Sequence, residues 1–133
     1  GSAAGIVDLF AEAIETDKKL PSAYRKGASA MQFDIVHDAS DHAAWKKREP
    51  KIVASAKQIA RYEFVLFNIN PLLTPMDRKL MWSRAMKVPY THLAKKLKMH
   101  RHTVKEKYLE TVIFIKYLIA YDKKLLDMID KIT

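Results

Sequence analysis

The feature that most constrains the fold is a series of three helical segments in the second half of the chain, the first of which begins at Thr74. The Thr74 hydroxyl can accept the backbone N–H of Asp77, and Pro75 occupies the first helical position, where its missing N–H has no partner to lose. These residues predict a T-x-x-D capping box. The helix is expected to end near Met86, because Pro89 disfavours helical backbone in the residue before it.

Two further helices are predicted before residue 119. A short helix over residues 90–97 is followed by a turn at 98–100 and by a longer helix that starts at Arg101. Ala94 is placed where the two helices cross, because its small side chain lets them approach. A short helix, a tight turn and a helix that opens with basic residues form the helix-turn-helix arrangement. The positions expected to face inward have helical spacing: Leu93, Leu97, Met99, Val104 and Tyr108.

Positive charge is concentrated in the same stretch. Residues 74–110 contain ten Lys and Arg against three acidic residues, a net charge of +7 out of +9 for the whole chain. An evenly spread excess would favour a solvated basic surface without a partner, whereas a concentrated one is typical of nucleic-acid-binding proteins. The charge distribution therefore predicts a nucleic-acid partner independently of the helical pattern.

Composition restricts the class of protein. The chain has 133 residues, of which 49% are hydrophobic, with three glycines and no cysteine. We expect an all-α fold, a compact domain of several helices that contains the helix-turn-helix and a long C-terminal helix. The lack of cysteine excludes disulfides, zinc fingers and a cysteine nucleophile. No apolar run reaches the roughly 18 residues of a membrane span, so no membrane partner is expected.

The chain is predicted to form a single domain over residues 6–133. Residues 1–5 have the composition of a tag remnant, and no Met precedes Ile6, so the sequence is interpreted as a piece of a longer chain. Within the domain, N-terminal helices in residues 6–72 are expected to pack on the helix-turn-helix in residues 73–121.

Three N-terminal helices are predicted. The first covers residues 6–20, the second residues 28–42 with an ordered loop after it, and the third starts at Pro50 and ends near Asn68. On the first helix, acids are expected on the solvated face: Asp8, Glu12, Glu15 and Asp17. The stripe expected to face the core of the third helix is Ile52, Ala56, Ile59, Ala60, Glu63, Phe64 and Phe67.

The last helix is expected to continue well beyond the length of an ordinary recognition helix. Part of its apolar face should cover the first helix, which has no other obvious partner. Asp122 is predicted to interrupt the helix, and residues 122–133 to form an amphipathic tail. The apolar residues at 125–129 either dock a second copy or a partner protein, or pack back on the core, and both alternatives stay open. The residues of the long apolar face are Val112, Ile115, Leu118 and Ile119.

Other polar and aromatic groups are interpreted as structural. Trp82 is predicted to be a core residue rather than a stacking platform, whereas for Trp45 a packing role and an exposed contact stay open. No nucleophile, phosphate loop or dinucleotide motif occurs, so we expect neither an enzyme nor a cofactor. A metal site is not predicted, because no third and fourth ligand converge on the polar residues with i, i+4 spacing: His37, Asp38, Asp41 and His42.

The segments VPYTHLAKKLKM and HRHTVKEKY resemble the helix-turn-helix of sigma-factor region 4 and of LuxR-type regulators. The successive residues Thr103, Val104 and Lys105 match those families closely. Lys98 departs from the pattern, because many members have glycine in the turn. A lysine there must adopt a left-handed or nearly left-handed backbone at some cost.

Most of residues 11–115 resemble a family of small proteins encoded by alphaproteobacterial phages and prophages, on the segments AEAIETDKKLP, WKKREP, LLTPMDRKLMWSRAMKVPYTHLAKKL and TVKEKY. In DRKLMWSRAMKVPY, Trp82, Arg84 and Pro89 match the family's W-x-R-x-x-x-V-P pattern. More loosely, the chain resembles the C-terminal part of the activators of gene-transfer-agent clusters. These resemblances imply a phage-type DNA-binding regulator and supply no catalytic residues; we expect it in the bacterial cytoplasm, with the nucleoid.

The predicted function is a transcriptional regulator, expected to be an activator, that binds double-stranded DNA with the recognition helix in the major groove. Base edges would be contacted by His100, Arg101, His102, Lys105 and Glu106. Phosphates would be contacted by Thr91, Lys95, Lys96, Lys98, Thr103 and Lys107. His100 and His102 are too close in sequence to pair on one helix face, so both are expected to be DNA-facing donors.

Two alternatives to this function stay open. One is a module that contacts RNA polymerase or a partner activator and touches DNA only secondarily. The other is a small terminase subunit, which also binds DNA by a helix-turn-helix but assembles into rings, so a homo-oligomer is among the expected partners.

Overall fold

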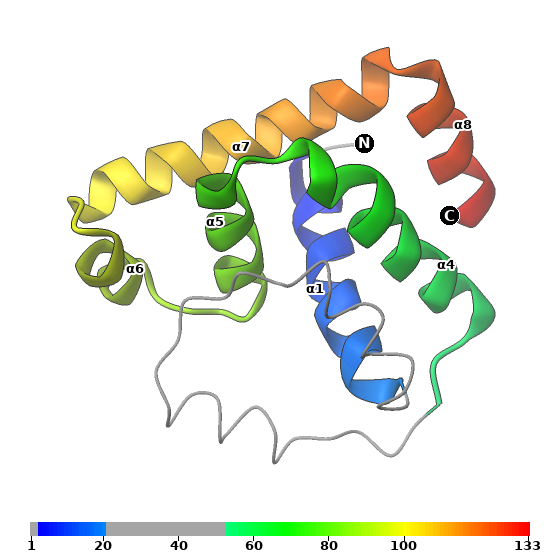
Figure 1. Cartoon of the computed structure of the whole chain (residues 1–133), viewed down its shortest axis with the longest axis horizontal. Helices are drawn as coiled ribbons and strands as arrows, with labels where there is room; N and C mark the ends of the chain where they lie inside the picture. Colours follow the sequence, from blue (N-terminus) through cyan, green and yellow to red (C-terminus); the bar gives the residue numbers. More distant parts are fainter. Residues whose placement is uncertain (1–2, 21–52) are drawn as a thin grey trace.

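The computed structural model describes residues 3–20 and 53–133, in which all regular secondary structure is helical (Figure 1). The all-α prediction is confirmed. The helix predicted at residues 28–42, the loop after it with Trp45, the four residues considered as metal ligands, Pro50 and Ile52 lie outside the described residues. The elements are α1 (Ala3–Lys19), α4 (Ala56–Phe64), the π-helical turn η1 (Val65–Ile69), the 3-10 turn η2 (Asn70–Leu72), α5 (Pro75–Ala85), α6 (Tyr90–Leu97), α7 (Arg101–Tyr121) and α8 (Lys123–Ile132).

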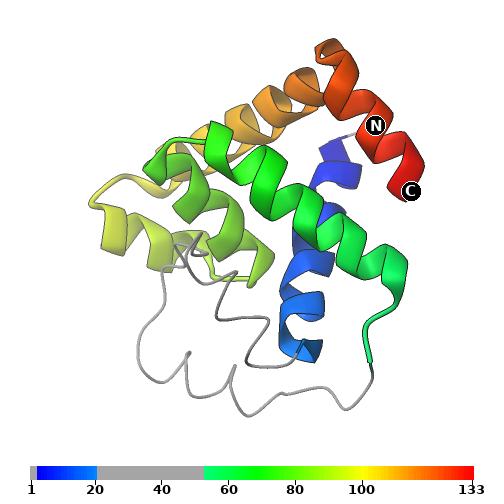
Figure 2. The same cartoon turned by 45° about the vertical axis from the view of Figure 1, so that its right-hand side comes forward.

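The unbroken helix α7 runs along one side of the molecule and connects its two ends (Figures 1 and 2). α6 packs on the N-terminal turns of α7, and α8 turns back from its C-terminus towards α4. α1 lies in the middle of the molecule and packs against α4, α5 and α7. The arrangement places α6 and the start of α7 at the end of the molecule opposite α4 and α8.

Buried apolar side chains from every described α-helix belong to one cluster. Its largest fully buried member is Trp82 of α5, whose ring centroid lies 4.7 Å from that of Phe10 on α1. The Trp82 Nε1–H donates a hydrogen bond to Asn70 Oδ1 at 2.8 Å, so the one polar atom of the indole has a partner in the core. The prediction that Trp82 is a core residue is confirmed.

The inward-facing positions of the helix-turn-helix are also as predicted. Leu93 and Val104 are fully buried, Tyr108 is 7% exposed, and Leu97 and Met99 are partly buried against the core. Further along α7, Val112, Ile115 and Ile119 are buried and Leu118 is partly buried. The helical spacing therefore identified the core side of α6 and α7 correctly.

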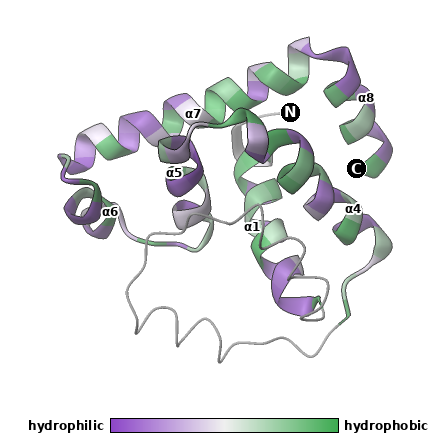
Figure 3. Ribbon diagram, in the orientation of Figure 1, coloured by the Kyte–Doolittle hydropathy of each residue, from purple (hydrophilic) through white to green (hydrophobic). Residues whose placement is uncertain are grey.

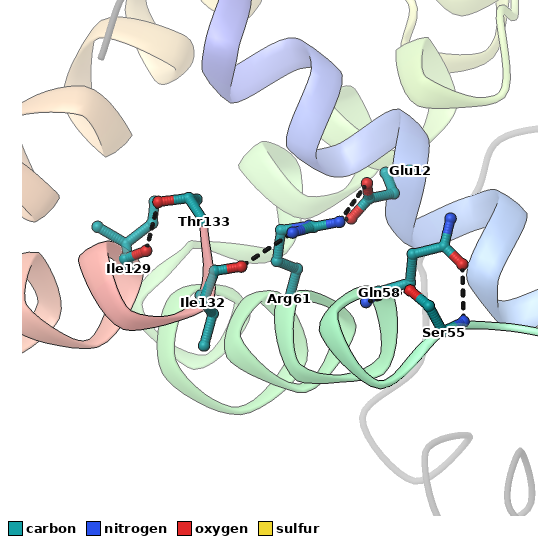
Figure 4. Close-up of polar contacts among 7 residues, drawn as sticks. All are labelled: Glu12, Ser55, Gln58, Arg61, Ile129, Ile132 and Thr133. Atoms are coloured by element: carbon teal, nitrogen blue, oxygen red, sulfur yellow. Dashed lines mark hydrogen bonds and ion pairs between the residues drawn. The ribbon is translucent and has the colours of Figure 1, made fainter.

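The helix predicted to begin at Pro50 begins at Ala56. Ser55 and Gln58 form a complete capping box at this point, with the Gln58 N–H donating to Ser55 Oγ at 3.2 Å and the Ser55 N–H to Gln58 Oε1 at 2.9 Å (Figure 4). The backbone N–H groups of Ser55 and Gln58, which have no partner within the helix, are thus both hydrogen-bonded, and this fixes the helix start.

The buried stripe of α4 and η1 also differs from the predicted one. Ala56 is exposed and Phe67 is 50% exposed, whereas Phe64 is buried as expected. The buried stripe consists of Tyr62, Phe64, Val65, Leu66 and Ile69. Apolar residues occur on two sides of this segment, and the side with Tyr62 faces the core because the Tyr62 hydroxyl donates to the buried Asp17 carboxylate at 2.7 Å.

The acids of α1 do not share a solvated face. Arg61 of α4 donates to both carboxylate oxygens of Glu12, at 2.6 and 3.1 Å, and to the Ile132 carbonyl of α8 at 2.9 Å (Figure 4). The hydrogen bond with Glu12 is the main cause that raises the pKa of Arg61 above its ordinary value. The prediction holds for Asp8 and Glu15, which are exposed, and is wrong for Glu12 and Asp17. α4 covers their side of α1, which the periodicity of α1 alone does not reveal.

Asp122 ends α7 and starts α8, as predicted. Its Oδ1 accepts the N–H groups of Lys124 and Leu125, at 3.0 and 3.3 Å. Leu125 is buried, and Met128 and Ile129 are partly buried against the core, so the tail packs back on the domain. Within the described residues, no helix has both the length and the apolar character required to cross a lipid bilayer.

Candidate nucleic-acid interface

Thr74 and Asp77 connect α5 to α7. The Thr74 hydroxyl accepts the Asp77 N–H at 3.2 Å, as predicted for the first half of the capping box. The Asp77 carboxylate instead accepts a hydrogen bond from the Thr111 hydroxyl of α7 at 3.0 Å. Since Thr111 is buried, this contact fixes how α5 lies against the middle of α7.

Arg84 and two tyrosines hold the connection from α5 to α6 against α7. Arg84 Nη1 donates to the Val88 carbonyl at 2.7 Å, and its guanidinium lies 4.1 Å from the ring centroid of Tyr90 and 5.9 Å from that of Tyr108. The two rings meet edge to face at 6.3 Å. Burial, more than the neighbouring Tyr90, raises the pKa of Tyr108, while Arg84 opposes that shift.

A lysine with left-handed backbone follows each of α5 and α6. Lys87 has φ 64°, and Lys98 has φ 56° and ψ 45°. At the second site the N–H groups of Lys98 and Met99 both donate to the Ala94 carbonyl. The expected left-handed turn at Lys98 is confirmed, and each lysine carries the steric cost that glycine would avoid.

His100 caps α7 and stacks on His102. Its backbone is extended, and its Nδ1 accepts the His102 N–H at 3.2 Å. The two rings are nearly parallel, with centroids 5.1 Å apart. The expectation that they cannot pair is wrong, because His100 lies outside the helix and its ring folds back over the first turn. With Nδ1 used as an acceptor, only Nε2 of His100 can donate to a ligand.

A hollow lies between the starts of α6 and α7. It is lined by Pro89, Tyr90, Thr91, Arg101, His102 and Lys105. The structure therefore brings one predicted phosphate contact, Thr91, next to three predicted base contacts. The first turns of both helices carry the positive end of the helix dipole, which favours an anion at this place.

All the predicted contact residues are exposed, but they do not share one face. Lys95 follows Thr91 by four residues and so continues the same face of α6, and Glu106 follows His102 by one turn of α7. Lys98 lies just beyond α6, in the left-handed residue that ends it. Helical spacing turns three further predicted contacts away from the hollow by about a third of a turn or more: Lys96, Thr103 and Lys107.

Two of the ten basic residues counted in this stretch have roles inside the protein. Arg78 donates to the Asn70 carbonyl at 3.0 Å and Arg84 to that of Val88, which leaves eight exposed Lys and Arg for a ligand. Sequence reasoning missed Tyr90, an aromatic wall of the hollow; its position directly after Pro89, at the first residue of a helix, was the available signal. Among residues 3–20 and 53–133, no three His, Asp or Glu side chains are grouped so that they could hold a metal ion.

A family model described as Domain of unknown function (DUF6362) matches residues 18–115. The match covers most of the chain, and the protein belongs to this family. The matched residues include all of α5 and α6 and the first turns of α7, and hence the whole candidate interface. Neither the curated proteins nor the solved structures contain a match to this chain.

Proposed function

We propose that the protein is a DNA-binding transcriptional regulator without enzymatic activity, and that it contacts double-stranded DNA through α6 and the start of α7. The observation that carries the proposal is the hollow where Arg101, His102 and Lys105 of α7 meet Thr91 of α6. Arg101 and Lys105 are one turn apart at the exposed N-terminal end of a helix, which is where helix-turn-helix proteins present side chains to base edges.

Charge and backbone geometry support the same proposal. Eight exposed Lys and Arg occur between residues 74 and 110. Lys98 occupies a left-handed position where glycine has the lower conformational energy, and it is exposed at the turn between α6 and α7. Strain of this kind concentrates at functional sites, so we infer that the charge of Lys98 is used by the ligand.

The resemblance to sigma-factor region 4, to LuxR-type regulators and to phage and gene-transfer-agent regulators adds the proposal that this DNA controls phage-like genes. A second candidate is a module that binds RNA polymerase or a partner activator. The exposed apolar side chains of α7 favour that candidate, because large exposed apolar surfaces usually mark protein interfaces.

Fluorescence anisotropy with a labelled duplex, repeated over a range of salt concentrations, tests the proposal. Lys95→Ala combined with Lys98→Asn removes two of the predicted phosphate contacts; it should weaken binding and reduce the slope of log K against log salt by about two, close to one for each lost contact. Lys124→Ala combined with Lys131→Ala removes the same charge from α8 and should leave the slope nearly unchanged. Absence of salt-dependent binding by the unaltered chain, or an equal loss in the α8 variant, overturns the proposal.

Base reading is tested on a duplex selected from a random pool. On the selected duplex, Arg101→Ala should weaken the binding free energy by about 1–3 kcal/mol more than it does on random DNA, as loss of a bidentate guanine contact does. Lys95→Ala should weaken all sequences alike, and Lys96→Ala measures how much the second face of α6 contributes. Identical effects of Arg101→Ala and Lys95→Ala on selected and random DNA would show that Arg101 is not a base reader.

A further inference from the structure

The part of α7 beyond the candidate interface exposes an apolar stripe. Four of its members recur every four residues and so form one ridge of the helix: Leu109, Ile113, Tyr117 and Tyr121. The fifth member, Phe114, lies beside this ridge. Their exposed fractions are 46%, 48%, 53%, 82% and 44% in that order. Figure 3 shows hydrophobic residues recurring along this half of α7. The tail, by contrast, keeps Leu125 buried.

The stripe is ordered and large enough for an interface. The rings of Tyr117 and Tyr121 stack with centroids 5.6 Å apart and an interplanar angle of 19°. A shallow groove beside them is lined by Phe114, Tyr117, Leu118, Tyr121, Asp122 and Lys123. With aromatic side chains of about 150–250 Å² each, the exposed parts of the stripe amount to on the order of 600 Å². Two copies would bury on the order of 1,200 Å², the lower end of specific interfaces.

We propose that a second copy of this chain covers the stripe, through antiparallel pairing of the two α7 helices about a two-fold axis that crosses the stripe between Ile113 and Tyr117, level with Ile115 along the helix. The assignment to a second copy rests on the proposed function, because two relations between the stripe and the DNA-facing residues of the same helix support it. One relation is an angle and the other is a length.

The angle follows from helical spacing at about 100° per residue. Arg101, His102 and Lys105 are centred about 90° around α7 from the stripe. A two-fold axis that relates antiparallel helices stands perpendicular to both of them and to the line that joins them. Both sets of DNA-facing residues would therefore point along that axis to the same side, as a dimer on one DNA duplex requires.

The length follows from the rise of about 1.5 Å per residue. The middle of the DNA-facing segment, near Thr103, lies roughly 18 Å along the helix from the middle of the stripe, near Ile115. The two-fold axis doubles this to about 36 Å between the two segments, and half-sites one turn of DNA apart are separated by about 34–36 Å. An unrelated partner protein would require neither the angle nor the length.

Sedimentation equilibrium tests the pairing. Antiparallel pairing near Ile115 sets Ile113 opposite Tyr117 of the other copy. The unaltered chain should form dimers at concentrations up to about 1 mM, and Ile113→Glu and Tyr117→Lys should each sediment as monomers. An equal mixture of the two variants should regain dimers, because the new carboxylate then faces the new ammonium. Val53→Glu adds the same charge at an exposed apolar residue before α4 and should leave the dimer intact.

Three results would overturn the proposal: a monomeric unaltered chain over that concentration range, dimers that persist in both single variants, or a mixture that stays monomeric. Equal thermal unfolding of the variants, followed by circular dichroism, excludes misfolding as the cause. Anisotropy with duplex DNA separates this proposal from the function. DNA binding by a chain that never dimerises overturns the pairing alone, and a dimer that does not bind DNA overturns the function alone.

Discussion

The guanidinium of Arg84 lies over the ring of Tyr90, with its carbon 4.1 Å from the ring centroid. Its Nη1 also donates a hydrogen bond to the carbonyl of Val88 at 2.7 Å. The same side chain thus holds the residues immediately before α6 and the first residue of that helix. The position of α6 relative to α7 depends on this contact, because Tyr90 in turn meets Tyr108 of α7.

Arg84→Lys should therefore lower the free energy of unfolding although it keeps the charge. Lysine lacks the planar group that lies over Tyr90 and donates to Val88 at the same time, and we expect a loss of about 1–2 kcal/mol in urea unfolding. Arg101→Lys, at an exposed position, is the matched control and should change stability by less than about 0.5 kcal/mol. Equal stability of the two variants would contradict the role given to Arg84.

Tyr62→Phe should destabilise the contact between α1 and α4. The hydroxyl of Tyr62 donates to the buried Asp17 carboxylate at 2.7 Å, and loss of a buried hydrogen bond to a charged group costs about 1.5–3 kcal/mol. Tyr121→Phe removes the hydroxyl of a residue that is 82% exposed and should be nearly neutral. Chemical unfolding of both variants measures the difference, and a neutral Tyr62→Phe would show that this bond adds nothing net.

Ala94→Leu should overpack the crossing of α6 and α7. Ala94 is partly buried against the core, and its carbonyl accepts the two N–H groups that close the turn. Extra methylenes at such a site typically cost about 1–3 kcal/mol. Ala120→Leu introduces the same group at an exposed position of α7 as control. If Ala94→Leu melts at the temperature of the unaltered chain, the crossing lies elsewhere.

Lys98→Gly should act in opposite directions on stability and on DNA binding. Glycine relieves the left-handed backbone of residue 98, a gain of about 0.5–1 kcal/mol after its own entropy is counted. The lost charge should reduce the salt slope of DNA binding by about one. Lys98→Asn, which tolerates the same backbone, separates charge from conformation. Weaker stability of Lys98→Gly would contradict the strain at this turn.

The sequence allowed the boundaries of α5, α6 and α7 to be predicted because local groups set them. Thr74 with Pro75 starts α5, Pro89 precedes α6, and Lys98 closes it. The start of α4 was misplaced because two start signals compete, and Ser55 with Gln58 satisfies more backbone groups than the proline-based start. Which side of α4 is buried depends on Asp17, a residue far away in sequence, and no local pattern encodes that pairing.

The candidate site was predictable only in part. Exposure of Arg101 and Lys105 follows from the spacing of Val104 and Tyr108, which must face inward. The stacking of His100 on His102 depends on the extended backbone before the helix, and the internal use of Arg84 depends on the fold of the α5–α6 connection. A count of charges in the sequence includes Arg84, but it does not reveal that the guanidinium contacts Val88 and Tyr90 inside the protein.

The continuity of α7 limits where the chain can change length. One helix of 21 residues carries the proposed DNA contacts at its start and the side chains that bury α1 further along. Inserting one residue between Tyr108 and Val112 would rotate one half against the other by about 100° and shift it by about 1.5 Å. Insertions and deletions should therefore be rejected inside α7.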